Sequence, residues 1–537
     1  MKHIELFAGC GGLSNGLKSA GFTLTLANEI SPMAAETFAF NILSEDLNYP
    51  STIKKTFWLK SKFDKNNLAR LREDYRVIST VSPEKIFSDI DSKTDLTTLD
   101  GSMLIGSIIE LNDLVSKNAK LRKAVSTAFG NGRIDLISGG PPCQSFSMAG
   151  LREHASDKNK LPWAFAEFVS KIKPRMVMLE NVTGILRAFK VDGKSRYAWF
   201  EVAKAFASIG CDYIPVCLHV NARNVGAAQN RPRFIMLGFE KKLFKRILSK
   251  GNLGAEGKKA FNKSLKFFEN VQQGNEPHYD ASFYYDLAKS HPIFNEWPFK
   301  DLNKNPFEGE PDIATVSDAI HDIRSPEDIS QASDYVKMIN RLSTSLNTLS
   351  KYESGLPPNH ELRTHGARVK ARFRLYQVMA KIANKAIVND LKSYLKDPVN
   401  NPITDDLVSH LSSEQFLSID GGFRSFSSKE TLEKFLTPMQ TKKQTQRALI
   451  ADSPAPAALS IADDACHYDK EQLRTLTVRE MARFQSFPDK FEFRSKVTTG
   501  GRMRQFEVPQ YTQVGNAVPP LLGKALGKVC KEFLSLE

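Results

Sequence analysis

The stretch Ile4-Glu5-Leu6-Phe7-Ala8-Gly9-Cys10-Gly11-Gly12, at the start of the 537-residue chain, decides the fold. Its first four residues predict a short strand, and the glycines that follow predict a tight turn. Helical spacing then runs from Leu13 to Ala20, where Gly21 ends it, and a second strand is expected over 23–27. A strand, a glycine turn, a helix and a strand in this order predict the opening of a doubly wound α/β sheet.

Further strand signals lie at 133–138, 175–180 and 234–238. A helical pattern over 163–172 separates the first two of them. This alternation predicts a largely parallel sheet flanked by helices. The fold class expected from the sequence is therefore α/β, with a Rossmann-like catalytic domain.

The character of the chain changes twice. Residues 51–103 are polar and weakly periodic, so we expect an insertion there. A basic run interleaved with phenylalanines begins at 241, and mixed sequence continues to 450, before α/β character returns over 451–537. The sequence thus predicts one catalytic domain built from 1–240 and 451–537, with a smaller module, 241–450, inserted between its two parts.

The formal charge of +14 favours a polyanionic partner, although a merely soluble basic protein would carry the same excess. None of the six cysteines has CxxC spacing, so no zinc site or other metal site is expected. No apolar run approaches the length of a membrane span, and the N-terminus lacks signal-peptide organisation. We therefore expect a cytoplasmic protein with reduced thiols.

The glycine turn is a candidate cofactor site. Gly9, Gly11 and Gly12 would let a ligand approach the backbone at the start of a helix. Glu29 follows Gly9 by about 20 residues, the separation at which an acidic side chain can bind ribose hydroxyls. NAD, FAD and S-adenosylmethionine (AdoMet) all fit this pattern, and so does a purely structural turn.

A stiff polar loop, Ser138-Gly139-Gly140-Pro141-Pro142-Cys143-Gln144-Ser145-Phe146-Ser147, follows one strand. Ligands of α/β sheets bind at the carboxyl ends of strands, and the two prolines restrict the backbone before Cys143. That placement suits a nucleophile held in one position. The alternative is a small buried hydrophobic side chain.

Three further motifs each allow a chemical and a structural interpretation. Glu180 ends an apolar strand, where partial desolvation would suit a general acid, although a solvated surface carboxylate fits as well. Arg231 and Arg233, two residues apart before a strand, could hold a base carbonyl or phosphate, or form surface ion pairs. Asn516, between a glycine and a proline pair, could touch a ligand or simply begin the last helix.

The order of these motifs identifies a resemblance. Phe-Ala-Gly-x-Gly-Gly, Gly-Gly-Pro-Pro-Cys-Gln-x-Phe-Ser, Glu-Asn-Val, Gln-x-Arg-x-Arg and Gln-x-Gly-Asn-x-Val follow one another, with Leu476–Asp489 before the last. Together they resemble the DNA (cytosine-5) methyltransferase family, most closely its bacterial restriction-modification members. The resemblance covers 1–44, about 104–239 and about 450–537.

The resemblance implies AdoMet as the methyl donor. Phe7 would stack on its adenine, Glu29 and Ile30 would bind near its ribose, and Gly9, Gly11 and Gly12 would lie against its methionine moiety. The other cofactor contacts that the resemblance implies are Ile108, Pro142, Leu161 and Asn516.

It also implies a mechanism and a partner. Cys143 would be the nucleophile, Glu180 the partner of the cytosine N3 edge, Arg233 a contact to the base carbonyl, and Arg231 a support of the same loop. Segment 241–450 would be the target recognition domain for double-stranded DNA. The resemblance further implies a monomer, and a restriction endonuclease acting on the same site as a possible partner.

Some residues depart from the family pattern. Ser107 stands before Ile108 where the family commonly has aspartate, and Gly226-Ala227-Ala228-Gln229 replaces a Gly-Val-Pro-Gln turn. An RNA methyltransferase on the same scaffold and a DNA-binding protein without activity are the main rival interpretations. A nicotinamide dehydrogenase is more remote, because nothing in the sequence provides a partner for hydride transfer.

Overall fold

The computed structural model describes residues 1–49, 53–73, 82–142, 161–191, 194–275, 277, 279–280, 283–306, 313–325, 329–441, 446–457, 459–501, 503 and 506–536. Cys143 and the rest of 143–160 lie outside this part of the chain.

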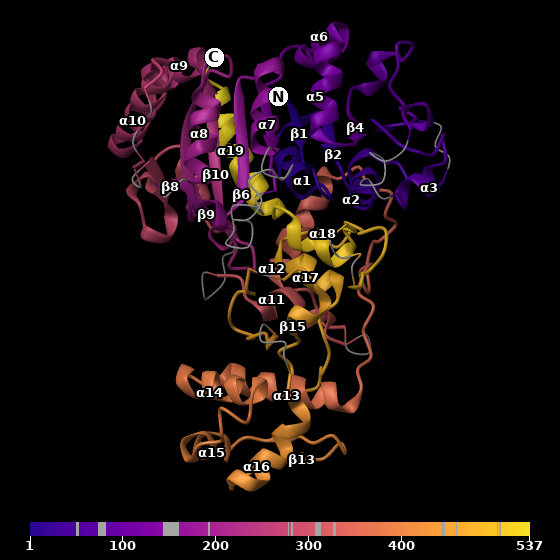
Figure 1. Ribbon diagram of the computed structural model, residues 1–537, viewed down its shortest axis with the longest axis vertical. Coiled ribbons are helices and arrows are strands. Elements are labelled where there is room, and N and C mark those ends of the chain that lie inside the picture. Colours follow the sequence, from indigo (N-terminus) through magenta and orange to yellow (C-terminus); the bar gives the residue numbers. More distant parts are fainter. Residues whose placement is uncertain are drawn as a thin grey trace.

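A nine-stranded sheet forms the upper body of the molecule in Figure 1, and it confirms the α/β fold expected from the sequence. Its strand order is β11-β9-β10-β6-β5-β1-β2-β4-β3, and β10 alone runs antiparallel to its neighbours. The strands are β1 Lys2–Leu6, β2 Thr23–Glu29, β3 Thr56–Trp58, β4 Ser102–Ile105, β5 Leu136–Gly139, β6 Met176–Val182, β9 Tyr213–Asn221, β10 Pro232–Glu240 and β11 Tyr284–Asp286.

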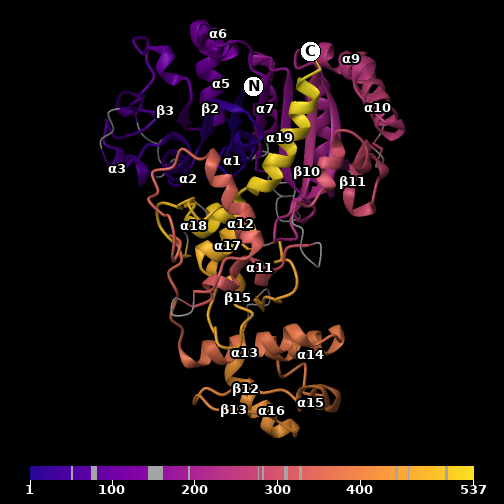
Figure 2. The same ribbon diagram turned by 180° about the vertical axis from the view of Figure 1, so that it is seen from behind.

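Helices cover both faces of the sheet (Figures 1 and 2). One face carries α5 Ile108–Lys117, α6 Ala119–Ser126, α7 Leu161–Ile172 and α8 Ala198–Ala207, and the other carries α1 Gly12–Ser19 and α19 Pro520–Leu534. The first and last helices pack closely because Gly16 lacks a side chain: a Cβ there would stand 2.4 Å from the Pro520 carbonyl oxygen. Both ends of the chain therefore complete one core.

The insertion expected over 51–103 is shorter in the structure, because β4 is an integral strand of the sheet. The described residues from 53 to 99 include α3 (Asn67–Leu71) and β3, which adds the outermost strand beside β4. Arg70 lies over the Trp58 ring and pairs with Asp89 at 2.9 Å, with all three side chains largely buried. This pair fastens the insertion to the edge of the sheet.

Residues 241–306 were expected in the inserted module, but most of their apolar side chains pack with the sheet. Helices α9 (Lys241–Lys250) and α10 (Ala255–Gln272) flank β10 and β9, and β11 extends the sheet. The phenylalanines of the basic run are buried in the main core: Phe244, Phe261, Phe267 and Phe268. Their alternation with lysine reflects amphipathic helices, so the boundary at 241 comes too early.

A middle layer, residues 313–346 and 449–517, lies below the sheet in Figure 1. It contains α11 Val316–Ile320, α12 Asp334–Asn340, β15 Ala465–Cys466, α17 Val478–Phe484 and α18 Gln510–Asn516, and it packs with α2 Pro32–Phe38 around a second core.

A lower lobe, residues 367–448, hangs below the middle layer and has a core of its own (Figures 1 and 2). It comprises α13 Ala367–Lys381, α14 Lys385–Lys396, α15 Asp405–Leu411, β12 Phe416–Leu417, β13 Phe423–Arg424, α16 Lys429–Leu436 and β14 Arg447–Ala448. The remaining strands, β7 Ala188–Val191 and β8 Lys194–Tyr197, form a hairpin. The projecting lobe is thus much smaller than the module expected over 241–450.

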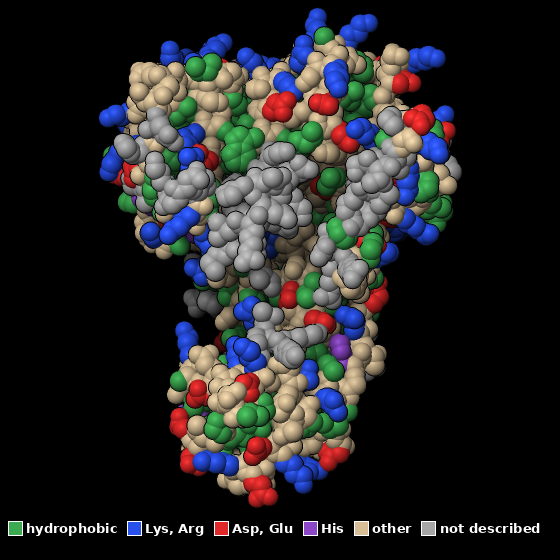
Figure 3. Space-filling model, in the orientation of Figure 1, with side chains coloured by type: hydrophobic (Ala, Val, Ile, Leu, Met, Phe, Trp, Pro, Cys, Tyr) green, Lys and Arg blue, Asp and Glu red, His purple; other side chains and the backbone are tan. Residues whose placement is uncertain are grey.

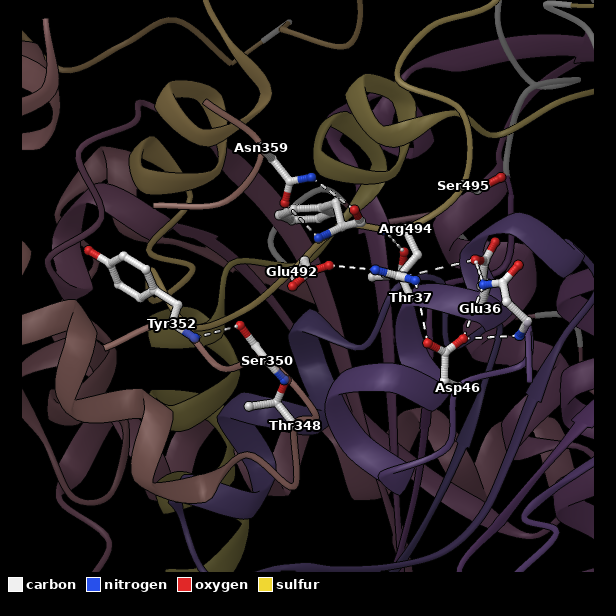
Figure 4. Close-up of polar contacts among 12 residues, drawn as sticks. Glu36, Thr37, Asp46, Thr348, Ser350, Tyr352, Asn359, Glu492, Arg494 and Ser495 are labelled. Atoms are coloured by element: carbon white, nitrogen blue, oxygen red, sulfur yellow. Dashed lines mark hydrogen bonds and ion pairs between the residues drawn. The ribbon is translucent and has the colours of Figure 1, made fainter. Parts of the chain in front are cut away.

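Charged side chains fasten the loop after α17 to α2 and the residues that follow it. Arg494 is surrounded by three carboxylates, with Glu492 at 2.5 Å, Asp46 at 3.5 Å and Glu36 at 4.0 Å (Figure 4). Its guanidinium also lies 4.5 Å from the centre of the Phe40 ring. These contacts join the loop after α17 to the second helix of the chain, so segments far apart in sequence are held together.

None of the helices in the described part of the chain combines the length and apolarity that crossing a membrane requires.

Candidate active site

The candidate site residues gather at one edge of the sheet. Strands β1, β2, β4, β5 and β6 are parallel, so their carboxyl ends share this edge. The antiparallel β10 begins there, with Arg233 paired in register with Val182 of β6. Motifs separated by up to about 230 residues are therefore brought onto a single edge, where α/β sheets bind their ligands.

At the cofactor end of this edge, Glu29 joins the ends of two strands. Its carboxylate accepts hydrogen bonds from the Gly9 and Ser31 backbone amides, each at 2.8 Å. Burial raises the pKa of Glu29, while these hydrogen bonds act in the opposite direction. Each carboxylate oxygen has a second lone pair, so Glu29 can still accept a hydrogen bond from a ligand hydroxyl.

The three glycines of the turn have different roles. Gly9 has φ +56°, and a Cβ built on it meets nothing within 4 Å, so this position opens onto free space. Gly11 has φ +98°, and its Cβ would press on Phe38 and Ile42 at 3.0 Å. A Cβ on Gly12 would stand 2.4 Å from the Val518 carbonyl oxygen. Only Gly9 therefore leaves room for a ligand on its Cβ side, whereas Gly11 and Gly12 serve packing there.

The apolar candidates differ in exposure. Phe7 is half-buried and meets the Phe165 ring edge-on at 6.5 Å. Ile30, at the end of β2, has 49% of its surface exposed and can offer a face to a ligand. Ile108 is only 2% exposed and packs in the main core, while its neighbour Ile109 is 44% exposed. Burial at the start of α5 leaves Ile108 little surface for an adenine ring.

The remaining cofactor candidates are accessible. Pro142 and Asn516 are exposed, and Leu161 is half-buried at the start of α7. Asn516 is the last residue of α18, so it belongs to a helix end rather than to the start of the final helix.

At the catalytic end of the edge, Glu180 and Arg233 form a pair. The Arg233 Nε lies 2.5 Å from Glu180 Oε1, and both side chains are largely buried. A Cβ on Gly140 would stand 2.8 Å from Glu180 Oε2, so the glycine loop lies directly against the carboxylate. Asn181 donates a hydrogen bond to the Pro141 carbonyl oxygen at 2.8 Å. These contacts hold the loop that leads to Cys143 beside Glu180.

Arg231 and Arg233 have different partners, although they lie only two residues apart. The Arg231 guanidinium donates hydrogen bonds to the carbonyl oxygens of Gly515 at 2.6 Å and Ala517 at 2.8 Å. A third bond, at 3.2 Å, reaches the Ala457 carbonyl oxygen. Burial lowers the pKa of Arg231, and Arg233 adds to this effect. Arg231 therefore positions the turn around Asn516, whereas Arg233 contacts Glu180.

The sequence analysis did not identify two residues that position the site loops. Asn181 lies inside the Glu-Asn-Val motif, but only the folded loop shows that its amide holds Pro141. Asn221 ends β9, and its side chain accepts hydrogen bonds from the Arg231 amide at 2.8 Å and the Arg223 amide at 3.3 Å. No sequence pattern indicated Asn221, because its partners depend on a ten-residue excursion of the chain.

Five cysteines are described, and all are buried and free of disulfides: Cys10, Cys211, Cys217, Cys466 and Cys530. Burial raises the pKa of each thiol, to about 12 for Cys10, Cys211 and Cys530. A nucleophile must ionise near neutral pH, so none of these five is suited to that role.

Within the same described ranges, no group of three or more His, Cys, Asp or Glu side chains is arranged to hold a metal ion.

One edge of a doubly wound sheet thus carries an open glycine turn beside Glu29 and, further along, a Glu180–Arg233 pair, at the place where proteins of this class bind their ligands. The model of the C-5 cytosine-specific DNA methylase family matches residues 1–67, 109–372 and 348–532. The chain belongs to this family and is a DNA cytosine methyltransferase.

Several bacterial relatives resemble the chain over almost its whole length. A type II methyltransferase of Desulfomicrobium norvegicum, M.DdeI, is 25% identical over 98% of this chain and 88% of its own length. M.Bpa9945I of Bacillus paralicheniformis is 23% identical over 99% of both chains. M.AgeI of Thalassovita gelatinovora is 24% identical over 100% of both.

Proposed function

We propose that the protein transfers a methyl group from AdoMet to C5 of a flipped-out cytosine within a specific short DNA sequence. The reaction proceeds through a covalent adduct between Cys143 and C6 of the base. The protein acts as the modification enzyme of a restriction-modification system, beside an endonuclease that recognises the same site. Its relatives carry type II methyltransferase names, which supports this assignment.

The observation that carries the proposal is the contact of the glycine loop with Glu180. Gly140 lies against the Glu180 carboxylate, and Cys143 follows it by three residues. The other five thiols are excluded by burial, so Cys143 is the remaining cysteine for a nucleophilic role.

The cofactor end of the edge fits AdoMet. Gly9 leaves open space beside the backbone, Glu29 has lone pairs for ribose hydroxyls, and Ile30 offers an exposed apolar face. Phe7, Pro142, Leu161 and Asn516 complete the proposed contacts, with Ile109 a better placed apolar side chain than Ile108. When bound, AdoMet supplies an electrophilic methyl group.

Covalent catalysis solves the poor nucleophilicity of cytosine C5. The Cys143 thiolate forms a bond to C6, and the electrons of the C5–C6 double bond become available at C5 to take up the methyl group. The Glu180 carboxyl group acts as the general acid at N3 and stabilises the charge that develops on the ring, while Arg233 holds the carbonyl oxygen. Loss of the C5 proton to a base restores the double bond and expels the thiolate.

The target cytosine must leave the stacked duplex to reach this edge, at a cost of a few kcal/mol. Lys and Arg side chains lie on the surface of both the upper body and the lower lobe (Figure 3). Such charges supply phosphate affinity that does not depend on sequence. The lower lobe, residues 367–448, is the part we assign to target recognition.

Conversion-based cytosine sequencing of DNA from cells that produce the protein tests the proposal, with Cys143→Ser as the matched control. We expect protected cytosines in one short recurring word, absent in the control. Purified protein with AdoMet is then compared on duplex DNA and on tRNA. Methylation of tRNA alone would replace the DNA assignment by an RNA one, and full activity of Cys143→Ser would exclude the adduct.

A further inference from the structure

A polar pocket lies beside the candidate active site and has no part in the chemistry above. It encloses about 220 Å³ at the carboxyl ends of β9 and β11. Its polar lining comes from the segment that precedes the Arg231 loop (Asn221, Arg223 and Asn224) and from the segment that follows β11 (Ser290, His291, Asn295 and Asn303). None of these residues belongs to the motifs that carry the family resemblance.

The lining selects for an anion. Among the described residues that line the pocket there is no carboxylate, whereas Arg223 contributes a cation. The His291 Nδ1 accepts a hydrogen bond from the Ile293 amide at 3.3 Å, which leaves Nε2 as the N–H donor of the ring. Asn224 donates to Asn303 Oδ1 at 3.0 Å, so the Asn303 amide nitrogen is free to donate in turn. Arg223, His291 and Asn303 therefore give the lining of the pocket three potential hydrogen-bond donors.

The acidic side chain at the end of β11 is engaged elsewhere. Asp286, the last residue of β11, pairs with His219 at 2.8 Å and accepts a hydrogen bond from the Ala288 amide at 2.9 Å. The Arg223 guanidinium has no ion pair or hydrogen bond within the described ranges of the chain. An anionic ligand would consequently meet an unpaired positive charge.

The pocket is coupled to the catalytic edge by position and by one side chain. Neighbouring strands are about 4.8 Å apart, so β9 and β11 lie about 5 and 10 Å from the strand that carries Arg233. One strand of DNA advances about 3.4 Å per nucleotide, so this separation corresponds to about one to three nucleotides. Asn221, which accepts hydrogen bonds from both the Arg223 and Arg231 amides, links the pocket to the Arg231 loop.

We propose that this pocket binds one backbone phosphate of the DNA duplex, about one to three nucleotides from the flipped cytosine. The inference rests on the proposed function, because it takes DNA as the substrate. Arg223, His291 and Asn303 donate hydrogen bonds to the phosphate oxygens. The contact positions the duplex over the catalytic edge and carries no sequence information.

Arg223→Ala tests the proposal, with Lys245→Ala as the control. Lys245 is an exposed cation on α9, after the far end of β10, so its removal costs the same charge at the opposite edge of the sheet. DNA affinity is measured by fluorescence anisotropy as a function of salt. We expect the slope of log affinity against log salt to fall by about 0.9 in Arg223→Ala and to stay unchanged in Lys245→Ala. The affinity loss should be equal for cognate and unrelated duplexes.

Duplexes with a single neutral methylphosphonate at each position around the target identify the phosphate. The wild-type protein should lose affinity at one position within three nucleotides of the cytosine, and Arg223→Ala should show no further loss there. Asn303→Asp, which places a carboxylate in the pocket, should weaken DNA binding at least as much as Arg223→Ala. AdoMet affinity should be unchanged in both variants.

Additive losses at every methylphosphonate position, or an unchanged salt slope, would overturn the inference. Tight binding of inorganic phosphate by wild type but not Arg223→Ala, with DNA affinity equal in the two, would make the pocket a small-anion site instead. Methyl transfer to DNA by the wild-type protein is followed in the same samples. Its absence would contradict the proposed function, whereas its presence with an unchanged slope contradicts the phosphate contact alone.

Discussion

Two buried arginine–carboxylate pairs, one in the middle layer and one at the catalytic edge, differ in how many of their hydrogen-bonding groups have a partner within the protein. Arg483 makes two bonds of 2.8 Å to Asp489, one of 2.6 Å to Asp322 and one of 3.1 Å to the Ala319 carbonyl oxygen. Arg233 contacts Glu180 through Nε and donates one hydrogen bond to its neighbour's carbonyl. Its other terminal nitrogen, Nη2, has no hydrogen bond to a described residue.

The difference separates a structural pair from one with capacity left for a substrate. Burial opposes ionisation of Asp489, but Arg483 outweighs it and lowers the pKa of that carboxyl. A saturated pair of this kind fixes one packing arrangement and offers nothing to a ligand. Glu180 and Arg233 keep unused donors and acceptors beside the Gly140–Pro142 segment, which is the condition for binding a polar base edge.

The largest expected effect comes from Glu180→Gln. Replacing the carboxyl by an amide removes the proton donor at N3, so methyl transfer in single turnovers should slow by about 10²–10⁴-fold. The melting temperature should fall less than in Asp489→Asn, because Glu180 has a single contact with Arg233 whereas Asp489 accepts two hydrogen bonds from Arg483. AdoMet affinity should change little, because the amide is isosteric. Asp489→Asn is the matched control: it should lower the melting temperature while leaving the rate per folded molecule intact. Equal changes in rate and in melting temperature in the two variants would contradict the distinction between a structural pair and a pair that serves the substrate.

Arg483→Ala should produce the largest loss of stability. It leaves the buried Asp489 and Asp322 carboxylates without their arginine, and breaking such a pair costs about 3–5 kcal/mol. Denaturant unfolding followed by circular dichroism measures this loss. Arg233→Ala, which faces the open edge, should cost less stability but reduce methyl transfer. A greater loss of stability in Arg233→Ala than in Arg483→Ala would contradict the interpretation that the Arg483 pair is structural and that the Arg233 pair serves the substrate.

A smaller effect is expected from Gly140→Ala. The new Cβ would stand 2.8 Å from Glu180 Oε2, so the carboxylate must move by some tenths of an ångström. We expect methyl transfer to slow by roughly tenfold, since catalysis depends on position, with little change in melting temperature. Gly184→Ala is the control, because its Cβ would meet only the Val182 side chain at 3.8 Å. An unchanged rate in Gly140→Ala would show that the loop is not held against Glu180.

The smallest effect is a loss of stability of the middle layer in acid. Burial lowers the pKa of His467 to about 4, so the neutral ring stabilises the fold at neutral pH and this contribution is lost as pH falls from about 6.5 to about 4. Arg474 overcomes burial and lowers the pKa of Glu480 to about 2, so its contribution is lost between about 4.5 and 2. Melting temperatures between pH 7 and 4 should therefore fall less in His467→Gln than in wild type. An equal fall of the melting temperature in the two proteins would show that His467 does not contribute to the loss of stability in acid.

The positions of five strands along the chain (β1, β2, β5, β6 and β10) and the site motifs were predictable because they depend on local sequence. The glycine turn, the Glu-Asn-Val motif and the Gln-x-Arg-x-Arg motif each occupy a few consecutive residues next to a strand. The different roles of Arg231, which binds backbone carbonyls around Asn516, and Arg233, which contacts Glu180, were not predictable. The partners of Arg231 lie more than 220 residues away in sequence. The core position of Ile108, next to the exposed Ile109, likewise depends on how α5 lies on the sheet.

The basic, phenylalanine-rich segment after 241 shows a second limit of prediction from sequence. Lysines alternating with phenylalanines fit either a nucleic-acid surface or amphipathic helices, and composition alone does not distinguish these two cases. In the structure, Phe261 and Phe268 are buried against the sheet. The choice between the two interpretations depended on whether a partner surface for the apolar face was present in the fold.

By itself, the sequence determined the α/β class, the family and the set of candidate chemical groups, because periodicity and short motifs are local properties of the chain. Only the tertiary structure decided which of those groups meet. It paired Glu180 with Arg233, placed Arg231 under the Asn516 turn, and assembled the polar pocket around Arg223. Contacts between residues hundreds of positions apart depend on burial and hydrogen-bond satisfaction across the whole fold, which no local pattern encodes.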